Sequence, residues 1–420
     1  MTTPSRLEQI RSRMPEGGLF AEKTWRIADT AFALSPKHVE QIEKLGHLLH
    51  RFNQACNLLY RQSWQGKKPA WIAELLDRGK PPELIALARD ERVKNHLPAV
   101  IRPDLILTEN GFAMSELDSV PGGIGLTGWL GETYSALGDN ILGGPRGMRD
   151  GFEKIFPAGD VLISEEAASY RPELEWLTSP ERVKAAETYT ANGASIYRFF
   201  EGFDWKNLHS LQASWQPGQP MTPPLKPYIE EKLWLALFWM RPLQEFWRQE
   251  LSEKGQRQLQ QIIPYSWVLD PTPLPNHAVI PELGIHDWKE MGAFSQKQRD
   301  LVLKISGFSP LAWGARGVYI GSDMPAPEWQ QIIDQSLADF DHQPHVLQRF
   351  VHGDLFAQNY YDEDGQLHEL KGRARVCPYY FVHQDKTTLG GVLVTLCPSD
   401  KKLLHGMKDA VISPAAAIGA

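Results

Sequence analysis

The segment Arg102–Gly123 constrains the fold of this chain more than any other, because it holds an Asn-Gly dipeptide between two runs of alternating apolar residues. Asn110-Gly111 in such a setting is a strong signal for a β-hairpin. A two-residue Asn-Gly turn would place Asp104 and Glu116 on opposite faces of the hairpin. A three-residue loop, Glu109–Gly111 with a left-handed glycine, would instead pair Asp104 with Glu116. We expect the three-residue loop.

Three carboxylates would then share one face of the hairpin. Glu116 and Asp118 are two residues apart on one strand, and Asp104 joins them across the turn, with Arg102 beside it. Three like charges this close repel one another unless a cation lies among them. Oxygen ligands without His or Cys favour a hard ion, so we expect Mg²⁺ at these three acids. The alternative is an exposed hairpin whose acids are solvated.

Composition narrows the class of protein. The chain has 420 residues, of which 42% are hydrophobic, enough for a large core in two or three domains. A formal net charge of −7 without a basic run argues against a nucleic-acid partner. Three cysteines without a CxxC pair suit a reducing compartment, and we expect a cytoplasmic protein. No signal core is present, and the longest apolar run, Leu233–Met240, is too short to span a membrane.

The periodicity of apolar residues predicts both helices and strands. The expected helical segments are Val39–Trp64, Pro81–Arg92, Glu181–Phe200 and Tyr228–Leu251, with a later amphipathic helix that opens at Pro327. The expected strands outside the hairpin are Val161–Ser164, Asp300–Ser306, Val318–Ile320, His345–Val351, Val376–Phe381 and Gly391–Leu396. The glycine-rich stretch 122–151 is expected to form loops between short elements, and the alanine-rich tail gives no signal.

Lys304 lies on a predicted strand, Asp300–Ser306, and the loop that follows, Gly307–Gly317, is rich in glycine and serine. Such a lysine supplies a point charge for phosphate oxygens, and the loop supplies backbone N–H groups that can close over them. The chain contains no G-x-x-x-x-G-K-[ST] pattern, so this is not a Walker-type loop. Taken alone, Lys304 is more simply a surface lysine before a hairpin, and Lys232 a lysine that extends from an amphipathic helix.

The order of these parts resembles that of the circularly permuted ATP-grasp proteins, the group that includes glutathionylspermidine synthase. The acids come first here, whereas the usual ATP-grasp order begins with the lysines. Arg102-Pro-Asp104 followed by Glu116-Leu-Asp118 is similar to the R-x-D and E-x-N stretches of that group. Three further segments resemble its first nucleotide lysine, its second lysine with the phosphate loop, and its adenine hinge: PPLKPYIEEKLWLALF, LVLKISGFSPLAWGARGVYIG and VLQRFV.

The resemblance implies an α+β protein with an ATP-grasp fold in circularly permuted order, which uses ATP and Mg²⁺. The expected divisions are a helical N-terminal region (1–98), the hairpin with a pre-ATP-grasp-like domain (99–225), a lid with the lysines and the Gly-rich loop (226–345), and the hinge with the C-terminal strands (346–420). The implied nucleotide-binding residues are Lys232, Lys304, Ser306, Gly307, Gly314, Gly317, Gln348 and Phe350. The implied metal ligands are Asp104, Glu116 and Asp118, and the implied catalytic residues are Arg102 and Arg316.

Two positions depart from the family pattern. Asp118 replaces the usual Asn, which adds a negative charge but keeps an oxygen ligand. Thr395 lies near the place where the synthase has an arginine. Arg373, Arg375 or Arg316 could supply the missing charge, and the sequence does not decide among them.

Two functions remain open at this stage. The first is an ATP- and Mg²⁺-dependent ligase that phosphorylates a carboxylate on a small molecule or peptide and lets an amine attack the acyl-phosphate. The second is a catalytically inactive nucleotide-binding or interaction protein with the same fold. The intact acids and lysines favour the ligase, whereas Thr395 favours the inactive protein. We expect the ligase, and the sequence names neither its substrates nor its oligomeric state.

Overall fold

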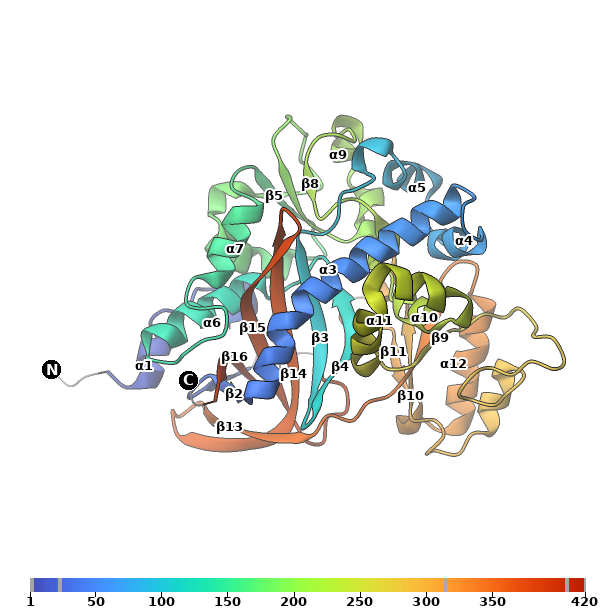
Figure 1. Ribbon diagram of the computed structural model, residues 1–420. Helices are drawn as coiled ribbons and strands as arrows, with labels where there is room; N and C mark the ends of the chain where they lie inside the picture. Colours follow the sequence, from blue (N-terminus) through green and yellow to red (C-terminus); the bar gives the residue numbers. More distant parts are fainter. Residues whose placement is uncertain (1–3, 22–24, 313, 315, 405–407, 419–420) are drawn as a thin grey trace. The chain divides into compact units, whose positions relative to one another are not determined.

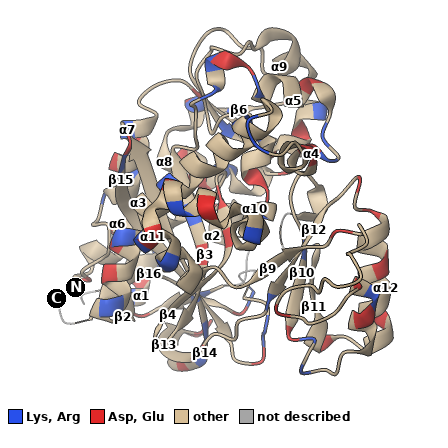
Figure 2. Cartoon of the chain, turned by 45° about the vertical axis from the view of Figure 1, so that its right-hand side comes forward, with Lys and Arg blue, Asp and Glu red and all other residues tan. Residues whose placement is uncertain are grey.

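The structure is a computed structural model that describes residues 4–21, 25–312, 314, 316–404 and 408–418. The chain divides into two compact units, each built from segments far apart in sequence (Figure 1). The first unit combines Met1–Asn53, Asp90–Leu225 and His352–Ala420, and the second combines Gln54–Arg89 with Lys226–Val351. Within the described ranges, no helix is long and apolar enough to cross a membrane. Acidic and basic residues are interspersed along the chain (Figure 2).

A mixed sheet of eight strands forms the centre of the first unit. Its strand order is β13 (Leu355–Tyr361), β1 (Arg26–Ala28), β16 (Val411–Ala417), β15 (Lys386–Pro398), β14 (Leu367–His383), β3 (Val100–Thr108) and β4 (Gly111–Asp118), with β2 (Phe32–Leu34) paired to β16. The two predicted strands Val376–Phe381 and Gly391–Leu396 are confirmed as parts of the longer β14 and β15.

Helices cover both faces of this sheet. Helix α3 (Pro36–Trp64) packs on one face, where a Cβ on Gly46 would lie 2.4 Å from the ring of Tyr380 in β14. Helix α7 (Gly147–Ile155) packs on the other face, where a Cβ on Gly151 would lie 2.2 Å from the ring of Phe381. Consecutive residues of a strand point to opposite faces, so these two contacts fix the helices on opposite sides. Helix α6 (Ile124–Ala136) packs beside α7.

A smaller parallel sheet also belongs to the first unit. Its strand order is β6 (Val183–Ala185), β5 (Asp160–Ile163), β7 (Ile196–Phe199) and β8 (Met221–Thr222). All four residues of β7 are buried, as expected for a strand inside a parallel sheet. The short helices of the first unit are α1 (Arg6–Arg11), α2 (Gly18–Ala21), α8 (Arg171–Leu177) and α9 (His209–Ser214).

The second unit contains an antiparallel sheet of four strands. Their order is β11 (Val318–Ile320), β10 (Leu301–Ile305), β12 (His345–Arg349) and β9 (Ser266–Val268). The amphipathic helix α12 (Ala326–Ala338) buries Trp329 and Ile333 in one apolar cluster with Leu303 and Leu347 of the sheet. The other helices of this unit, besides the end of α3, are α4 (Trp71–Asp77), α5 (Pro82–Ala88), α10 (Leu233–Trp239) and α11 (Gln244–Ile262). The strands and the helix predicted for this part of the chain are confirmed.

One local prediction was wrong, and two further segments contain more regular structure than the sequence indicated. The stretch 122–151 contains the helices α6 and α7 rather than loops alone, because several of its glycines allow close helix packing instead of breaking the chain. The segment 181–200 contains the strands β6 and β7 rather than a helix. The alanine-rich tail forms β16, in which Val411 and Ile412 pair with both β1 and β15 and the three alanines 415–417 pair with β2. In each case long-range packing outweighs the local signal.

Two glycines of α6 offer a direct test of this packing. Gly125→Ala would place its Cβ 2.0 Å from the backbone oxygen of Glu173, so we expect a loss of about 1–3 kcal/mol of unfolding free energy. At Gly131 the nearest atom is 3.7 Å away, so Gly131→Ala is the matched control and should be neutral or stabilising by up to about 1 kcal/mol. Urea unfolding of the two variants measures both effects. Equal stability of the two variants would contradict the packing described for α6.

Candidate active site

The β3–β4 hairpin brings four charged side chains to one face of the large sheet. Asp104 pairs with Glu116, and Arg102 pairs with Asp118. Directly paired residues of antiparallel strands point to the same side, and so do residues two apart on one strand. The predicted pairing of Asp104 with Glu116 is therefore confirmed.

The loop that produces this register differs from the predicted one. Thr108 pairs with Gly111, which leaves a two-residue loop, Glu109-Asn110, and Gly111 does not have a positive φ. A β-bulge then leaves Ser115 unpaired between two paired positions of the opposite strand. The extra residue shifts the register by one and returns the acids to a common face. The predicted three-residue loop was wrong, although it gave the correct pairing.

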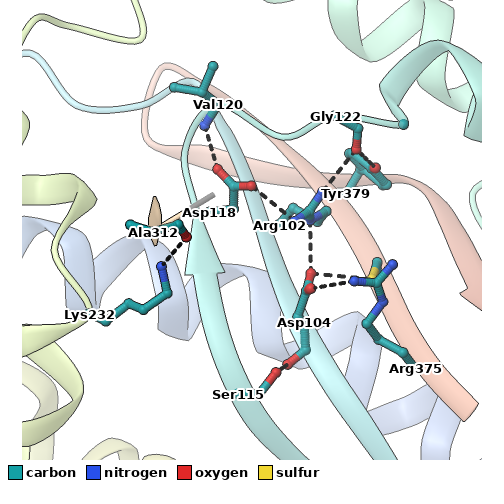
Figure 3. Close-up of polar contacts among 12 residues, drawn as sticks. Arg102, Asp104, Ser115, Asp118, Val120, Gly122, Lys232, Ala312, Arg375 and Tyr379 are labelled. Atoms are coloured by element: carbon teal, nitrogen blue, oxygen red, sulfur yellow. Dashed lines mark hydrogen bonds and ion pairs between the residues drawn. The ribbon is translucent and has the colours of Figure 1, made fainter. Parts of the chain in front are cut away.

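The carboxylate of Asp104 is enclosed by two arginines and a thiol (Figure 3). Its Oδ1 lies 3.0 Å from Nε of Arg102, and its Oδ2 accepts a hydrogen bond of 3.0 Å from Nη1 of Arg375 in β14. The thiol of Cys377 donates to Oδ1 at 3.3 Å. Burial raises the pKa of Cys377 to about 12, and the charge of Asp104 acts in the same direction, so this thiol stays protonated.

Arg102 also connects the hairpin to the turn that follows it. Its Nη2 donates to Asp118 at 3.0 Å and its Nη1 donates to the carbonyl oxygen of Gly122 at 2.9 Å. The hydroxyl of Tyr379 donates to the same carbonyl at 2.7 Å. The other oxygen of Asp118 accepts from the backbone N–H of Val120 at 2.8 Å. Burial raises the pKa of Asp118, although Arg102 opposes this effect.

The described arrangement does not fit a bound magnesium ion. Both oxygens of Asp104 and both oxygens of Asp118 already accept contacts from protein groups. Within the described parts of the chain, no group of three or more His, Cys, Asp or Glu side chains is arranged to hold a metal. The three acids are thus brought together as predicted, but arginine guanidinium groups supply the cations next to Asp104 and Asp118.

Arg375 is the arginine that lies directly opposite Thr395 in the sheet. The two residues pair directly between β14 and β15, so their side chains share a face. Thr395 is fully buried, and its hydroxyl has no hydrogen-bond partner among the residues that the structure describes. Arg373 instead donates from its Nε to the carbonyl oxygen of Gly353 at 2.9 Å. Of the three arginines considered from the sequence, Arg375 is therefore the one beside Thr395.

Glu173 belongs to α8, and its side chain contacts the N-terminus of α6 on the same side of the sheet. Its carboxylate accepts hydrogen bonds from the backbone N–H groups of Gly123, Gly125 and Leu126 at 2.7, 3.1 and 3.0 Å. Its side chain is fully buried, and burial raises its pKa to about 7, while these three N–H groups oppose the rise. Since Arg102 binds Gly122 and Glu173 binds Gly123, the turn is held from both sides.

The expected phosphate-binding lysines lie in the second unit. Lys304 in β10 is 8% exposed, and its Nζ donates to Oε1 of Gln348 in β12 at 3.0 Å. Nε2 of Gln348 in turn donates to the hydroxyl of Ser266 in β9 at 3.0 Å. Lys304 and Gln348 therefore meet on one face of the four-stranded sheet. Lys232 precedes α10, and its Nζ donates to the carbonyl oxygen of Ala312 at 3.4 Å (Figure 3).

The loop after Lys304 is described except for residues 313 and 315. Ser306 is fully buried at its start, and Gly307 follows it against Glu231. Gly314 has a left-handed φ of 65°, which favours glycine, and a Cβ on Gly317 would lie 2.5 Å from Ile305. The exposed Arg316 belongs to the same loop.

The end of the hinge segment also belongs to the second unit. The backbone N–H of Phe350 donates to the carbonyl oxygen of Asp300 at 3.1 Å. The predicted site residues thus form two groups, one in each unit.

Several contributors were missed by the sequence analysis. Cys377, Tyr379 and Glu173 contact the hairpin or its turn, and Glu231 with Lys80 supports the loop of the second unit. The alternation of polar residues in RARVCPYY could have indicated that Arg375, Cys377 and Tyr379 share a face. The other contacts depend on long-range packing and leave no signal in a single sequence.

Comparisons with known proteins bear on the fold. No family model and no curated protein matches the sequence. A solved structure of a glutathione synthetase-like effector from Globodera pallida superposes over 100% of this chain and 98% of its own, with a TM-score of 0.53 and 10% sequence identity. This chain shares the fold of that effector. The expected fold is thereby confirmed in its coarser form, a mixed α+β protein, and the permuted order stays a prediction.

A putative γ-glutamylcysteine synthetase from Methylobacillus flagellatus KT matches more loosely. The match covers 79% of this chain and 83% of that one, with a TM-score of 0.37 and 13% identity. Such a superposition is too distant to bear on the fold.

The buried Glu173 predicts a specific dependence of stability on pH. Its pKa is about 7 in the folded protein and near 4.5 when solvated, so folding favours the protonated form. This contribution is complete below pH 4.5 and is lost as the pH rises to about 7, by about 3 kcal/mol. Urea unfolding from pH 4.5 to 8 should therefore show wild type losing stability relative to Glu173→Gln. A difference that does not change with pH would contradict the burial of this carboxyl.

Proposed function

We propose that the protein is an ATP-dependent carboxylate–amine ligase. The observation that carries this proposal is the position of Lys304, a buried lysine held by Gln348 directly before the Gly-rich loop. The fold shared with a glutathione synthetase-like protein supports the same conclusion. The reaction would transfer the terminal phosphoryl group of ATP to a substrate carboxylate and let an amine displace the phosphate. The substrates would be a small-molecule or peptide carboxylate and an amine acceptor.

The second unit would hold the nucleotide. Lys304 and Lys232 would neutralise charge on the phosphates, and backbone N–H groups of the loop from Ser306 to Gly317 would donate to the phosphate oxygens. Preorganised cations of this kind lower the barrier to phosphoryl transfer because they need not reorient during the reaction. The backbone from Gln348 to Phe350 would bind the adenine edge, as the resemblance to the hinge implies. Arg316 would contribute a further charge from the loop.

The first unit would stabilise the negative charge that develops on the acyl group. The side chains of Arg102 and Arg375 are 13% and 14% exposed, and both remain charged at every physiological pH because nearby carboxylates raise their pKa values. Arg375 would take the role of the arginine that Thr395 lacks, because it lies directly across from this residue on the neighbouring strand.

Magnesium is implied by the resemblance, with Asp104, Glu116 and Asp118 as its ligands. A metal at these acids would need Asp104 and Asp118 to exchange guanidinium contacts for the ion, so we assign no step to it.

We further propose that the chain has the circularly permuted ATP-grasp order, with a pre-ATP-grasp-like subdomain around the small parallel sheet. A cytoplasmic location is proposed on the three free cysteines, all of which are buried.

An inactive nucleotide-binding protein is the second candidate, and one observation favours it. Arg102 bridges Asp104 and Asp118, which leaves these acids engaged rather than open to a metal. In this case the protein would bind nucleotide without turning it over. Release of phosphate from ATP in the presence of mixed amino acids and polyamines distinguishes the two candidates.

The role of Lys304 can be tested by substitution. We expect Lys304→Ala to weaken the binding of an ATP analogue by about 1–3 kcal/mol, or roughly 10- to 150-fold, because a charged phosphate contact is lost. Isothermal titration with a non-hydrolysable analogue and Mg²⁺ measures this effect. Lys289→Ala, an exposed lysine of the same unit, is the matched control and should bind as wild type does. Wild-type affinity in Lys304→Ala would contradict the nucleotide assignment.

Substitution of Glu116 distinguishes a metal-binding role of the three hairpin acids from a purely structural one. If the acids recruit Mg²⁺ together with the nucleotide, Glu116→Gln should abolish the Mg²⁺ dependence of nucleotide binding. Its stability without metal should change by less than about 1 kcal/mol or even rise, because one of three repelling charges is removed. Glu109→Gln at the exposed tip of the same hairpin is the control. A Glu116→Gln protein with an unchanged Mg²⁺ dependence would exclude these acids as the metal site.

A further inference from the structure

The carboxylate of Glu231 joins three segments of the second unit that are far apart in sequence. Nζ of Lys80 lies 2.5 Å from its Oε1, and the hydroxyl of Ser306 donates to its Oε2. The side chains of Lys80 and Glu231 are 2% and 3% exposed, so this ion pair lies away from solvent. Nζ of Lys80 also donates to the carbonyl oxygen of Leu76 at 2.6 Å, at the end of α4. None of these contacts was predicted from the sequence.

Ser306 connects Glu231 to the two segments that bear Lys232 and Lys304. Its carbonyl oxygen accepts from the backbone N–H of Lys232 at 3.0 Å, and its hydroxyl oxygen accepts from the N–H of Leu233 at 3.0 Å. It also follows Lys304 by only two residues in the chain. The bond between Ser306 and Glu231 therefore sets the spacing between the backbone of Lys232 and the end of the strand that bears Lys304.

The first residues of the Gly-rich loop pack on the same ion pair. A Cβ on Gly307 would lie 3.1 Å from both Cδ and Oε1 of Glu231, so the carboxylate leaves little room for a side chain at this position. Phe308 has a left-handed φ of 47°, a conformation that a bulky residue adopts only when its surroundings hold it there. Nζ of Lys80 lies 5.6 Å from the centre of the Phe308 ring, within range of a cation–π interaction.

We propose that Lys80 and Glu231 are positioning residues for the Gly-rich loop and for Lys232. A buried ion pair is a weak source of stability, because the cost of removing both charges from water offsets their attraction. The pair is instead placed where it fixes the direction in which the loop leaves β10. The phosphate-binding consequence of this inference rests on the proposed function, whereas the effect on the loop does not.

The test uses the full chain with three substitutions. Lys80→Met alone leaves a buried carboxylate without its cation, so folding itself is expected to suffer. The double variant Lys80→Met/Glu231→Leu removes both charges and keeps an apolar volume, so its melting temperature should stay close to that of wild type. Arg257→Met is the control, because it removes the exposed ion pair between Arg257 and Glu253 of α11 in the same unit and leaves no buried charge behind.

Two measurements read out the position of the loop. Trypsin cleavage after Arg316 reports how readily the loop opens, and titration with a non-hydrolysable ATP analogue reports whether the lysines are aligned. We expect the double variant to be cleaved several-fold faster and to bind the analogue at least about tenfold more weakly, with both values unchanged in Arg257→Met. A well-folded double variant with wild-type cleavage and affinity would overturn the inference. If wild type itself binds no nucleotide, the proposed function fails, and the cleavage rates alone decide the role of the ion pair.

Discussion

The negative charge of Asp104 inside the large sheet is the constraint on which the rest of the first unit depends. A carboxylate that is 5% exposed requires compensation, and two guanidinium groups provide it from two different strands. Arg102 comes from the same strand as Asp104, whereas Arg375 comes from β14. Removal of either arginine would leave this carboxylate with one guanidinium partner instead of two. The register of β3 against β14 is thereby specified by charge as well as by apolar packing.

This charge balance extends to the turn after the hairpin. Arg102 and Tyr379 hold the carbonyl oxygen of Gly122, and Glu173 holds the N–H groups at the start of α6. The second unit shows the same principle in another setting, where a single carboxylate, Glu231, holds the start of the Gly-rich loop. In both units, buried ionic groups fix loops that the apolar core alone would leave free to shift. Fixed loops and fixed cations are what a phosphoryl-transfer site requires.

The sequence predicted much of this arrangement, for physical reasons that can be named. The sequence pattern identified the hairpin and three strands of the second unit, β10, β11 and β12, but not β9, and helical periodicity identified α3 and α12. The common face of Asp104 and Glu116 was predicted correctly from a wrong loop, because the bulge at Ser115 was not foreseen. A bulge depends on how the strand packs in its sheet and has no reliable local signal.

Other features could not be predicted because they depend on contacts between distant segments. The choice of Arg375 over Arg373 follows from the pairing of β14 with β15, which a single sequence does not reveal. The glycines of 122–151 indicated loops, yet in α6 they permit close approach to α8. The cations beside Asp104 and Asp118 were expected to be a metal, and in the described arrangement they are arginines.

The central claim is that the second unit binds a nucleotide with its base at the end of β12. Photolabelling of the wild-type protein with 8-azido-ATP, followed by mass spectrometry of the peptides, tests this claim most directly. Labelling should be saturable, should decrease when ATP competes, and should map to the segment around Gln348–Phe350. Labelling that ATP does not compete, or that maps outside Lys226–Val351, would contradict it.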